Sequence, residues 1–223
     1  MNQLVISSTL QEIDPFASLS GIINDIVPGQ VMVINKDLSF LLTGVGSPET
    51  IFHLTRLLSK SKFDRVIQVG IAGSYKSNIG PGALVEIKEE VFADLGIDKL
   101  GEFVSVFESG ITNPNAMPFN SGVLINPYQR ITSFYQARAV TVNTVSGSEK
   151  LIEQRVSKYN PDIESMEGAA AFYTCLSLGI PILQVRSISN YVEPRNRSSW
   201  KMEVAIQNLN KWLIEFVNTD VAD

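Results

Sequence analysis

The chain has 223 residues, 44% of them hydrophobic and 18% charged, which fits a single α/β domain that buries a substantial core. Its 18 basic and 23 acidic residues give a formal charge of -5, and no Lys/Arg cluster is long enough to follow a phosphate backbone, which argues against nucleic acid as a partner. No apolar run approaches the ~20 residues that cross a bilayer, and the first residues lack the basic start of a signal peptide, so we expect a cytoplasmic protein without a membrane partner.

The chain contains one cysteine, Cys175, and one histidine, His53, so neither a disulfide within the chain nor a Cys/His zinc site can form. His53 falls inside an expected helix over 48–59. We interpret it as an ordinary helix residue, since site residues come more often from loops or strand ends. The sequence therefore predicts chemistry by carboxylates, amides and backbone groups, with no metal or organic cofactor.

Short apolar, β-branched runs alternate with longer helical patterns, which is typical of a sheet layered with helices. Strands are expected over 4–7, 31–35, 40–45, 66–69, 83–93, 121–125, 139–145 and 180–187. Helices are expected over 48–59, 127–137, 150–156, 168–178 and 198–217. Pro127 can open the second helix, and Ser146 with Glu149 three residues later indicates a capping box for the third.

No internal repeat and no linker divides these elements. We predict one α/β domain over 1–223, with a mixed, strongly bent sheet flanked by helices. The polar segment 108–120 is a candidate for a mobile lid, on composition alone.

Two glycine-rich turns follow expected strands. Gly44-Val45-Gly46 precedes a helix as a dinucleotide fingerprint would, but Glu49 stands where that fingerprint has glycine, so the signal is weak. In the second turn, Gly70-Ile71-Ala72-Gly73-Ser74, small residues let a flat or anionic ligand approach backbone N–H groups. A tight turn without a ligand is the alternative.

Two carboxylates, Glu164 and Glu167, flank Met166 directly before the small residues 168–171. A carboxylate at such a helix start either balances the positive end of the helix dipole or holds a ligand. The two oxygens of one carboxylate match the two hydroxyl donors of a cis-diol. The residues alone leave both interpretations open.

Asn190 ends a strand and opens the polar stretch 190–197. Ligands of α/β folds bind at strand ends, although an asparagine there is more often a turn former than a catalyst. Arg186, on the same strand, more often pairs with a core carboxylate than with a ligand.

Five motifs carry a resemblance that spans nearly the whole chain. They are Val5-Ile6 followed by Gln11-Glu12-Ile13, Val69-Gly70-Ile71-Ala72-Gly73-Ser74, Glu90-Val91-Phe92-Ala93-Asp94-Leu95-Gly96, Glu164-Ser165-Met166-Glu167-Gly168 and Arg186-Ser187-Ile188-Ser189-Asn190. Each is weak alone, but their order and spacing resemble the purine nucleoside phosphorylase and nucleosidase family, and within it the futalosine hydrolases of menaquinone biosynthesis.

The resemblance implies the roles of the sugar-side residues. Glu12 would polarise a water for attack on the anomeric carbon, and Glu167 would hold the ribose diol with Met166 beneath the sugar. A carboxylate near the developing positive charge stabilises an oxocarbenium-like transition state and can accept the water's proton. Without the resemblance, Glu12 is simply a solvated acid at a strand–helix junction. The family also implies a small nucleoside as partner and a homo-oligomer whose neighbour closes the site.

The base would lie against Ala72, Gly73, Val145 and Asn190. Adenine-specific members of the family have aspartate where this chain has Asn190. An asparagine NH2 donates to N7 or to O6 of hypoxanthine, whereas an ionised aspartate would face O6 with like-signed lone pairs. We therefore expect a 6-oxopurine, with Asn190 assisting the departing hypoxanthine anion by a hydrogen bond instead of a full proton.

Two further positions bear on the base. Thr144 stands where many adenine-directed relatives place an aromatic residue, so stacking must come from elsewhere. Phe92 is a candidate apolar wall, although a phenylalanine in a strand is more often part of the core.

Phosphate-using members of the family carry arginines near the first strand and before the glycine-rich turn. Here the first arginine of the chain is Arg56, and Gln68 precedes Val69-Gly70. Without a guanidinium fork to bind a dianion, water is the expected nucleophile.

Futalosine carries a benzoate in place of the nucleoside's 5′-hydroxymethyl end, and a carboxylate pairs well with arginine. Arg195 and Arg197 are candidates for this contact, with a solvated loop as the alternative. The resemblance thus predicts hydrolysis of futalosine to hypoxanthine and dehypoxanthine futalosine. The alternatives are a methylthioadenosine/adenosylhomocysteine nucleosidase, from which Asn190 and Thr144 depart, and a nucleoside-binding module without turnover, against which Glu12 argues.

Overall fold

The computed structural model describes residues 1–22, 25–128 and 131–219, which form a layered α/β fold. The strands are β1 (Gln3–Ser7), β2 (Val31–Asn35), β3 (Leu38–Leu42), β4 (Arg65–Ser74), β5 (Leu84–Phe92), β6 (Gly96–Lys99), β7 (Glu102–Ser105), β8 (Leu124–Ile125), β9 (Tyr135–Thr141), β10 (Ile163–Ser165) and β11 (Ile182–Tyr191). The helices are α1 (Asp14–Leu19), α2 (Ser47–Leu58), α3 (Glu149–Tyr159), α4 (Gly168–Ser177) and α5 (Met202–Thr219), with 3-10 turns η1 (Gln11–Ile13) and η2 (Arg197–Ser199). No helix within these ranges is long and apolar enough to span a bilayer.

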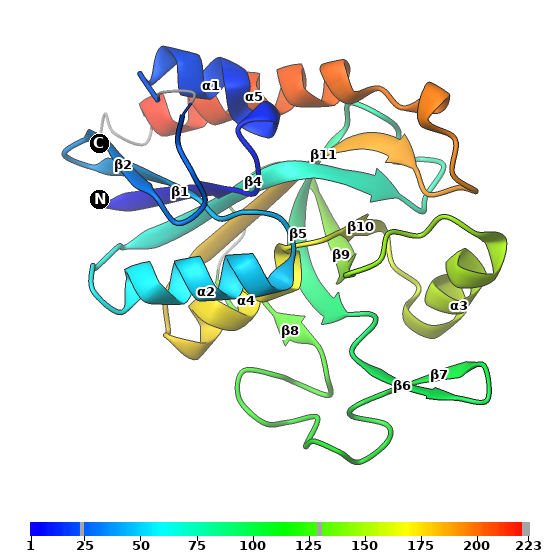
Figure 1. Cartoon of the computed structure of the whole chain (residues 1–223). Coiled ribbons are helices and arrows are strands. Elements are labelled where there is room, and N and C mark those ends of the chain that lie inside the picture. The colour runs from blue at the N-terminus through cyan, green and yellow to red at the C-terminus, as the bar shows by residue number, and fades with distance from the viewer. Residues whose placement is uncertain (23–24, 129–130, 220–223) are drawn as a thin grey trace.

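The central sheet is mixed and strongly bent, which confirms the predicted fold class (Figure 1). Its strand order is β10-β9-β5-β11-β4-β1-β3-β2, with β8 beside β5. β10 pairs parallel with β9 and antiparallel with the end of β4, so the first five strands of this order close on themselves. The long strand β4 makes this closure possible, because its first residues pair with β1 on one side and Gly73 and Ser74 pair with β10, while β11 pairs with β4 from Val66 to Ser74. The ends of β4, β10 and β11 meet as a result.

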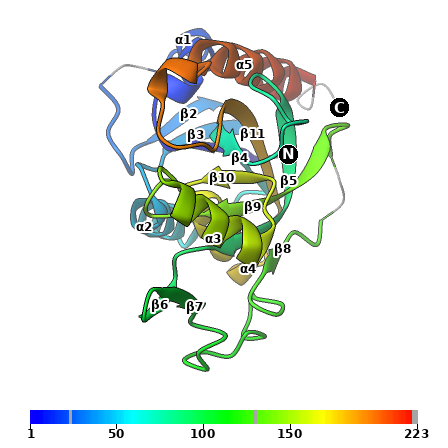
Figure 2. The same cartoon turned by 90° about the vertical axis from the view of Figure 1, so that its right-hand side faces the viewer.

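Helices cover both faces of the sheet (Figures 1 and 2). α1 and α5 lie on one face, where Phe16, Leu209 and Leu213 are buried against sheet residues. α2 and α4 lie on the other, where Leu54 and Phe172 are buried. The alternation of strands and amphipathic helices in the sequence reflects these two apolar layers.

The start of α4 packs closely against the sheet, which explains the run of small residues at 168–171. A Cβ at Gly168 would lie 1.8 Å from Oε1 of the buried Glu90. A residue larger than glycine therefore cannot occupy the first position of this helix without displacing Glu90.

The prediction of a helix over 127–137 is wrong for the residues that the structure describes. Residues 129–130 lie outside the described residues. Residues 131–134 form no helix, and β9 begins at Tyr135. Thr132 donates from its amide and hydroxyl to Glu86 at 2.8 and 2.7 Å, and β9 pairs along its length with β5. This pairing outweighs the helix-opening tendency of Pro127, since tertiary contacts routinely override local propensity.

The predicted capping box is also wrong. α3 begins at Glu149 with Ser148 as the preceding residue, and no side chain caps its amides. Ser146 Oγ instead contacts Glu164 Oε2 and Arg155 Nη1, each at 2.6 Å. The Ser146 hydroxyl therefore bonds to the buried ion pair of Glu164 and Arg155 instead of capping the helix. The neighbouring strand ends at Thr141 rather than at 145.

Candidate active site

A cavity of about 330 Å³ opens at the carboxyl ends of β1, β4 and β11. The loops after β1, β3, β9, β10 and β11 form its walls, and α5 adds Met202 and Ile206. The cavity is lined by the expected residues Glu12, Ala72, Gly73, Val145, Met166, Glu167, Asn190 and Arg195, but not by Arg197 or Phe92. Because ligands of α/β folds bind at this edge of the sheet, the cavity is the candidate active site.

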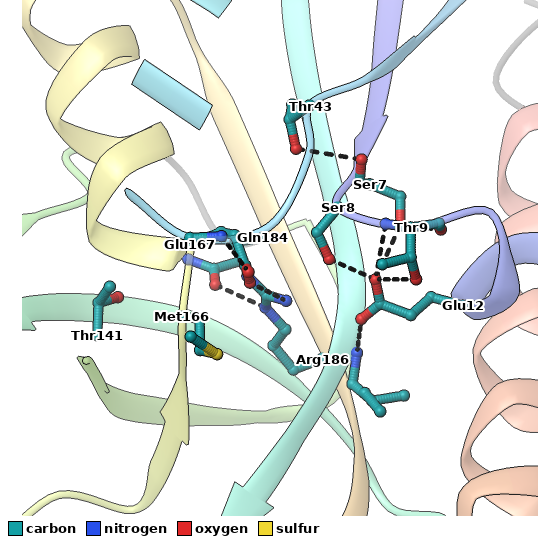
Figure 3. Close-up of polar contacts among 12 residues, drawn as sticks. Ser7, Ser8, Thr9, Glu12, Thr43, Thr141, Met166, Glu167, Gln184 and Arg186 are labelled. Carbon is teal, nitrogen blue, oxygen red and sulfur yellow. Dashed lines mark hydrogen bonds and ion pairs between the residues drawn. The ribbon is translucent and has the colours of Figure 1, made fainter. Parts of the chain in front are cut away.

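Glu12 lies in η1, directly after β1, at the strand–helix junction that the sequence indicated (Figure 3). Its nearly buried carboxylate accepts from the Ser8 hydroxyl at 2.5 Å and from the Thr9 amide and hydroxyl at 3.2 and 3.1 Å, all through Oε2. Oε1 accepts from the Ile71 amide at 2.9 Å. A carboxylate oxygen has two lone pairs, so Oε1 keeps one for a water or a sugar hydroxyl.

Gly70 permits two charged side chains to approach the backbone of β4 closely. A Cβ there would lie 2.4 Å from Arg186 Nη1 and 2.9 Å from Glu12 Oε1. The small residues that the sequence assigned to a turn are in fact the end of β4. The glycine serves this close approach, not a sharp reversal of the chain.

Glu167 immediately precedes α4, and its carboxylate is nearly buried. Oε1 accepts from the Gly46 amide at 2.9 Å, and Oε2 lies 3.9 Å from Arg186 Nη1 (Figure 3). Burial raises the pKa of the Glu167 carboxyl; Arg186 opposes this rise and Glu12 adds to it. Gly46 has a φ of 87°, which glycine adopts readily. The turn that resembles a dinucleotide fingerprint thus orients a carboxylate of the site.

Arg186 is 1% exposed, and its guanidinium lies beside the carboxylate of Glu167. Its Nε donates to Gln184 Oε1 at 3.0 Å and its Nη1 faces Glu167, while Nη2 has no hydrogen-bond partner among the described residues. The pairing with a buried carboxylate that the sequence favoured is present. Sequence reasoning missed that this carboxylate belongs to the site, because an arginine within an apolar strand gives no local sign of which partner it meets.

Asn190 lies at a bulge of β11 opposite Gly73. Its Oδ1 accepts from Ser189 Oγ at 2.7 Å, and its Nδ2 donates to the Tyr191 carbonyl at 2.8 Å. Because a carbonyl only accepts, the amide nitrogen must lie on that side, and its second N–H stays free to donate. A Cβ at Gly73 would lie 3.3 Å from Nδ2 and 2.9 Å from Val192, so glycine makes room for this amide.

Ala72, Val145 and Met166 complete the walls that the sequence predicted. Two aromatic side chains, Tyr191 and Trp200, also line the cavity, and sequence reasoning singled out neither. A tryptophan close to two arginines in a polar segment was the available signal.

Glu164 is not available as a sugar ligand, although it borders the same cavity. Its carboxylate accepts from Tyr75 at 2.6 Å, from the Ser146 amide and hydroxyl at 2.9 and 2.6 Å, and from Arg155 at 2.9 Å. Burial, followed by the charge of Glu164, raises the pKa of Tyr75. Of the two carboxylates around Met166, Glu164 fastens α3 to the sheet and Glu167 faces the site.

Arg195 and Arg197 differ in position although both lie near Trp200, at 5.7 and 5.9 Å from its ring centroid. Arg195 lines the cavity. Arg197 begins the exposed turn η2 and does not.

Two other candidates from the sequence, Phe92 and the segment 108–120, do not contribute to the cavity. Neither Thr144 nor Phe92 lines it, so Phe92 is not an apolar wall for a base. Phe92 lines a separate hollow with Phe107, Phe119 and Tyr173. The candidate lid 108–120 contributes to that hollow and not to the cavity, because Phe119 packs against Phe107 and Tyr173 with ring centroids 5.0 and 5.7 Å apart.

In the described part of the chain, no three His, Cys, Asp or Glu side chains are placed to share a metal ion.

Comparisons with known proteins point to one group. The family described as the phosphorylase superfamily matches residues 29–218. A futalosine hydrolase of Thermus thermophilus is 27% identical over 174 residues, 76% of each chain. A 5′-methylthioadenosine/S-adenosylhomocysteine nucleosidase of Haemophilus influenzae is 24% identical over 162 residues, 70% of this chain and 68% of that one.

Solved structures share the fold over nearly the whole chain. A futalosine hydrolase mutant of Helicobacter pylori superposes with a TM-score of 0.77 at 19% identity, covering 98% of this chain and 100% of that one. A 5′-methylthioadenosine/S-adenosylhomocysteine nucleosidase of Neisseria meningitidis, in complex with methylthio-immucillin-A, gives a TM-score of 0.78 at 18% identity, covering 98% and 99%.

Proposed function

The chain belongs to the phosphorylase superfamily and is an N-glycosyl hydrolase, and we propose that it hydrolyses the N-ribosidic bond of futalosine, releasing hypoxanthine and dehypoxanthine futalosine. The observation that carries the proposal is the pair of buried carboxylates, Glu12 and Glu167, oriented in one cavity with Asn190 at its other strand end. The identity to futalosine hydrolases supports the choice of substrate within the family.

In the proposed reaction, a water oxygen bonds to the anomeric carbon while the C1′–N9 bond breaks and its electron pair leaves with the base. Glu12 Oε1, which has a free lone pair, accepts the proton of the water. Glu167 receives the two ribose hydroxyls, and both carboxylates lie close enough to stabilise the developing positive charge on the sugar. The free N–H of Asn190 hydrogen-bonds to the departing hypoxanthine anion.

Water is the proposed nucleophile on electrostatic grounds. The cavity is lined by four glutamates, Glu12, Glu164, Glu167 and Glu193, and by one arginine, Arg195, among the described lining residues. Arg155 balances the charge of Glu164, which leaves three glutamates against Arg195. The guanidinium of Arg186 is already engaged by Glu167. A phosphate dianion would meet a predominantly negative site, which repels it, whereas water carries no such cost.

The most specific part of the proposal is the preference for a 6-oxopurine base, and a substitution at Asn190 tests it. The wild-type protein should release hypoxanthine from futalosine faster than adenine from methylthioadenosine. Asn190→Asp should lower kcat/KM for futalosine by about 10- to 100-fold, because two acceptors would then face each other at O6. Release of base is followed by chromatography with both substrates. A wild-type preference for methylthioadenosine, or an Asn190→Asp variant that keeps its preference for futalosine, would contradict the 6-oxopurine assignment.

The benzoate of futalosine is assigned to Arg195, which lines the cavity. Arg195→Ala should lower kcat/KM for futalosine by roughly 10- to 100-fold, the worth of a charge-assisted hydrogen bond, and leave inosine cleavage unchanged. Arg197→Ala is the matched control, since it removes the same charge beside the same Trp200 but outside the cavity. An equal loss of kcat/KM for futalosine and for inosine in Arg195→Ala would show that Arg195 does not bind the carboxylate of futalosine.

A further inference from the structure

Behind the cavity, a chain of buried polar groups connects strand β5 to Glu167. Glu90 is fully buried; its Oε2 accepts from the Thr141 hydroxyl at 2.9 Å and its Oε1 from Gln184 Nε2 at 3.1 Å. Gln184 Oε1 in turn accepts from Arg186 Nε at 3.0 Å, and Arg186 Nη1 lies 3.9 Å from Glu167 (Figure 3). The reaction described above uses neither Glu90 nor Gln184.

The donors in this chain point toward Glu90 from both sides. The Thr141 hydroxyl accepts from the Ala169 amide at 2.7 Å, so its own hydrogen is directed to Glu90. On the other side, the Gln184 amide must turn its NH2 to Glu90 in order to present its oxygen to Arg186. Both carboxyl oxygens of Glu90 therefore accept hydrogen bonds, and this arrangement of donors fits the ionised form of the side chain.

A proton on Glu90 would break this order. On Oε1 it would face the Gln184 NH2, and turning that amide would place its NH2 against Arg186 Nε–H. On Oε2 it would face the Thr141 hydroxyl hydrogen. In either case the bonds that Glu90 accepts from Gln184 and Thr141 lose the assistance of its charge and become weaker.

We propose that Glu90 is a positioning residue which, when ionised, holds Gln184 and through it the Arg186 guanidinium, so that Glu167 stays fixed toward the ribose diol. Protonation of Glu90 releases this hold. The inference rests on the proposed function, because it concerns the orientation of the carboxylate that binds the sugar. Gly168 supports the arrangement, since any larger residue would displace both Glu90 and Gln184.

The pKa of Glu90 lies within the pH range in which the enzyme can be assayed. Burial raises the pKa of the Glu90 carboxyl to about 7; Arg186 on β11 opposes the rise, as do the bonds from Thr141 and Gln184, and Glu167 at the start of α4 adds to it. Arg186 and Glu167 are the charged side chains that act on Glu90 among the described residues. The hold on Arg186 should therefore weaken as the pH falls through about 7.

The test is the pH profile of kcat/KM for the released base in wild type and in Glu90→Gln. Wild-type kcat/KM should rise between pH 6 and 8. The variant should be flat over this range and roughly 10-fold below wild type at pH 8, in line with the loss of an outer positioning group. Gln184→Met breaks the connection without touching Glu90, and should give the same low, flat profile.

Glu86→Gln is the matched control. Glu86 is buried on the same strand and accepts from a threonine and a glutamine, as Glu90 does, but those partners, Thr132 and Gln136, lead away from the cavity. This variant should keep the wild-type pH profile. A Glu90→Gln enzyme that retains the rise between pH 6 and 8, or a Glu86→Gln enzyme that loses it, would overturn the inference.

Thermal melting separates this outcome from failure of the proposed function. The pKa of Glu90 is raised by folding, so its ionisation lowers wild-type stability progressively as the pH rises from about 4.5 through 7. The melting temperature of Glu90→Gln, relative to wild type, should therefore increase from pH 5 to pH 8. If no nucleoside is cleaved, the proposed function fails and the positioning role fails with it. If base is released but the melting difference does not change with pH, only the inference fails.

Discussion

Glu12→Gln should lower kcat for base release by about 10²- to 10⁴-fold, the usual worth of a general base. Glutamine keeps the shape of the side chain but cannot accept the proton of the attacking water. It also places an NH2 group against donors, because Oε1 faces the Ile71 amide and Oε2 faces Ser8 and Thr9. The measurement is single-turnover release of base at saturating substrate.

The control for this variant is ligand binding. In the proposed site hypoxanthine binds through Asn190 rather than through Glu12, so its dissociation constant should change little in Glu12→Gln. A loss of activity accompanied by an equal loss of binding would indicate a disturbed fold. A general base contributes at least about 10²-fold to kcat. A reduction in kcat of less than about fivefold would therefore contradict this role for Glu12.

Glu167→Gln should lower kcat/KM by about 10²- to 10⁴-fold, because two charge-assisted hydrogen bonds to the ribose diol are weakened, each worth about 1.5–3 kcal/mol. The free energy of unfolding should change less than in a variant of a hydrogen-bonded ion pair. Glu167 lies 3.9 Å from Arg186 without a hydrogen bond, burial raises the pKa of its carboxyl, and the oxygen of a glutamine can still accept from the Gly46 amide. Kinetics and thermal melting are measured on the same preparation.

Glu164→Gln is the matched control, three residues earlier and equally buried. It leaves Arg155 with Asp94, 3.9 Å away, as its remaining charged partner, and breaking a buried ion pair costs about 3–5 kcal/mol of stability. We expect Glu164→Gln to lower the melting temperature more than Glu167→Gln, and kcat/KM less. The reverse ranking would assign the sugar to Glu164.

Much of the fold could be predicted because local patterns and packing agree. The apolar strand β1, the amphipathic helix α2 and the small-residue start of α4 each carry a signal that the tertiary structure preserves. The helix predicted over 127–137 is wrong because the partner strand β5 lies about fifty residues earlier in the chain, and a pairing at that distance leaves no local trace. The capping role predicted for Ser146 is also wrong because of tertiary contacts, since its hydroxyl donates to Glu164 and accepts from Arg155.

The candidate site was predictable where a motif ends a strand. Glu12, Met166 and Glu167 follow strands, Asn190 lies near the end of β11, and the structure brings the four residues to one cavity. The distinction between Glu164 and Glu167 was not predictable, because it depends on which carboxylate Arg155 and Arg186 reach through the folded sheet. The roles of these residues stay predictions, as do the homo-oligomer and the cytoplasmic location.

The most direct test of futalosine hydrolysis is product analysis in water enriched in oxygen-18, with and without phosphate. The proposed function predicts that futalosine yields hypoxanthine and a sugar product that carries the heavy oxygen at C1′, at the same rate in both buffers. A sugar phosphate, a requirement for phosphate, or adenine from methylthioadenosine without hypoxanthine from futalosine would contradict it.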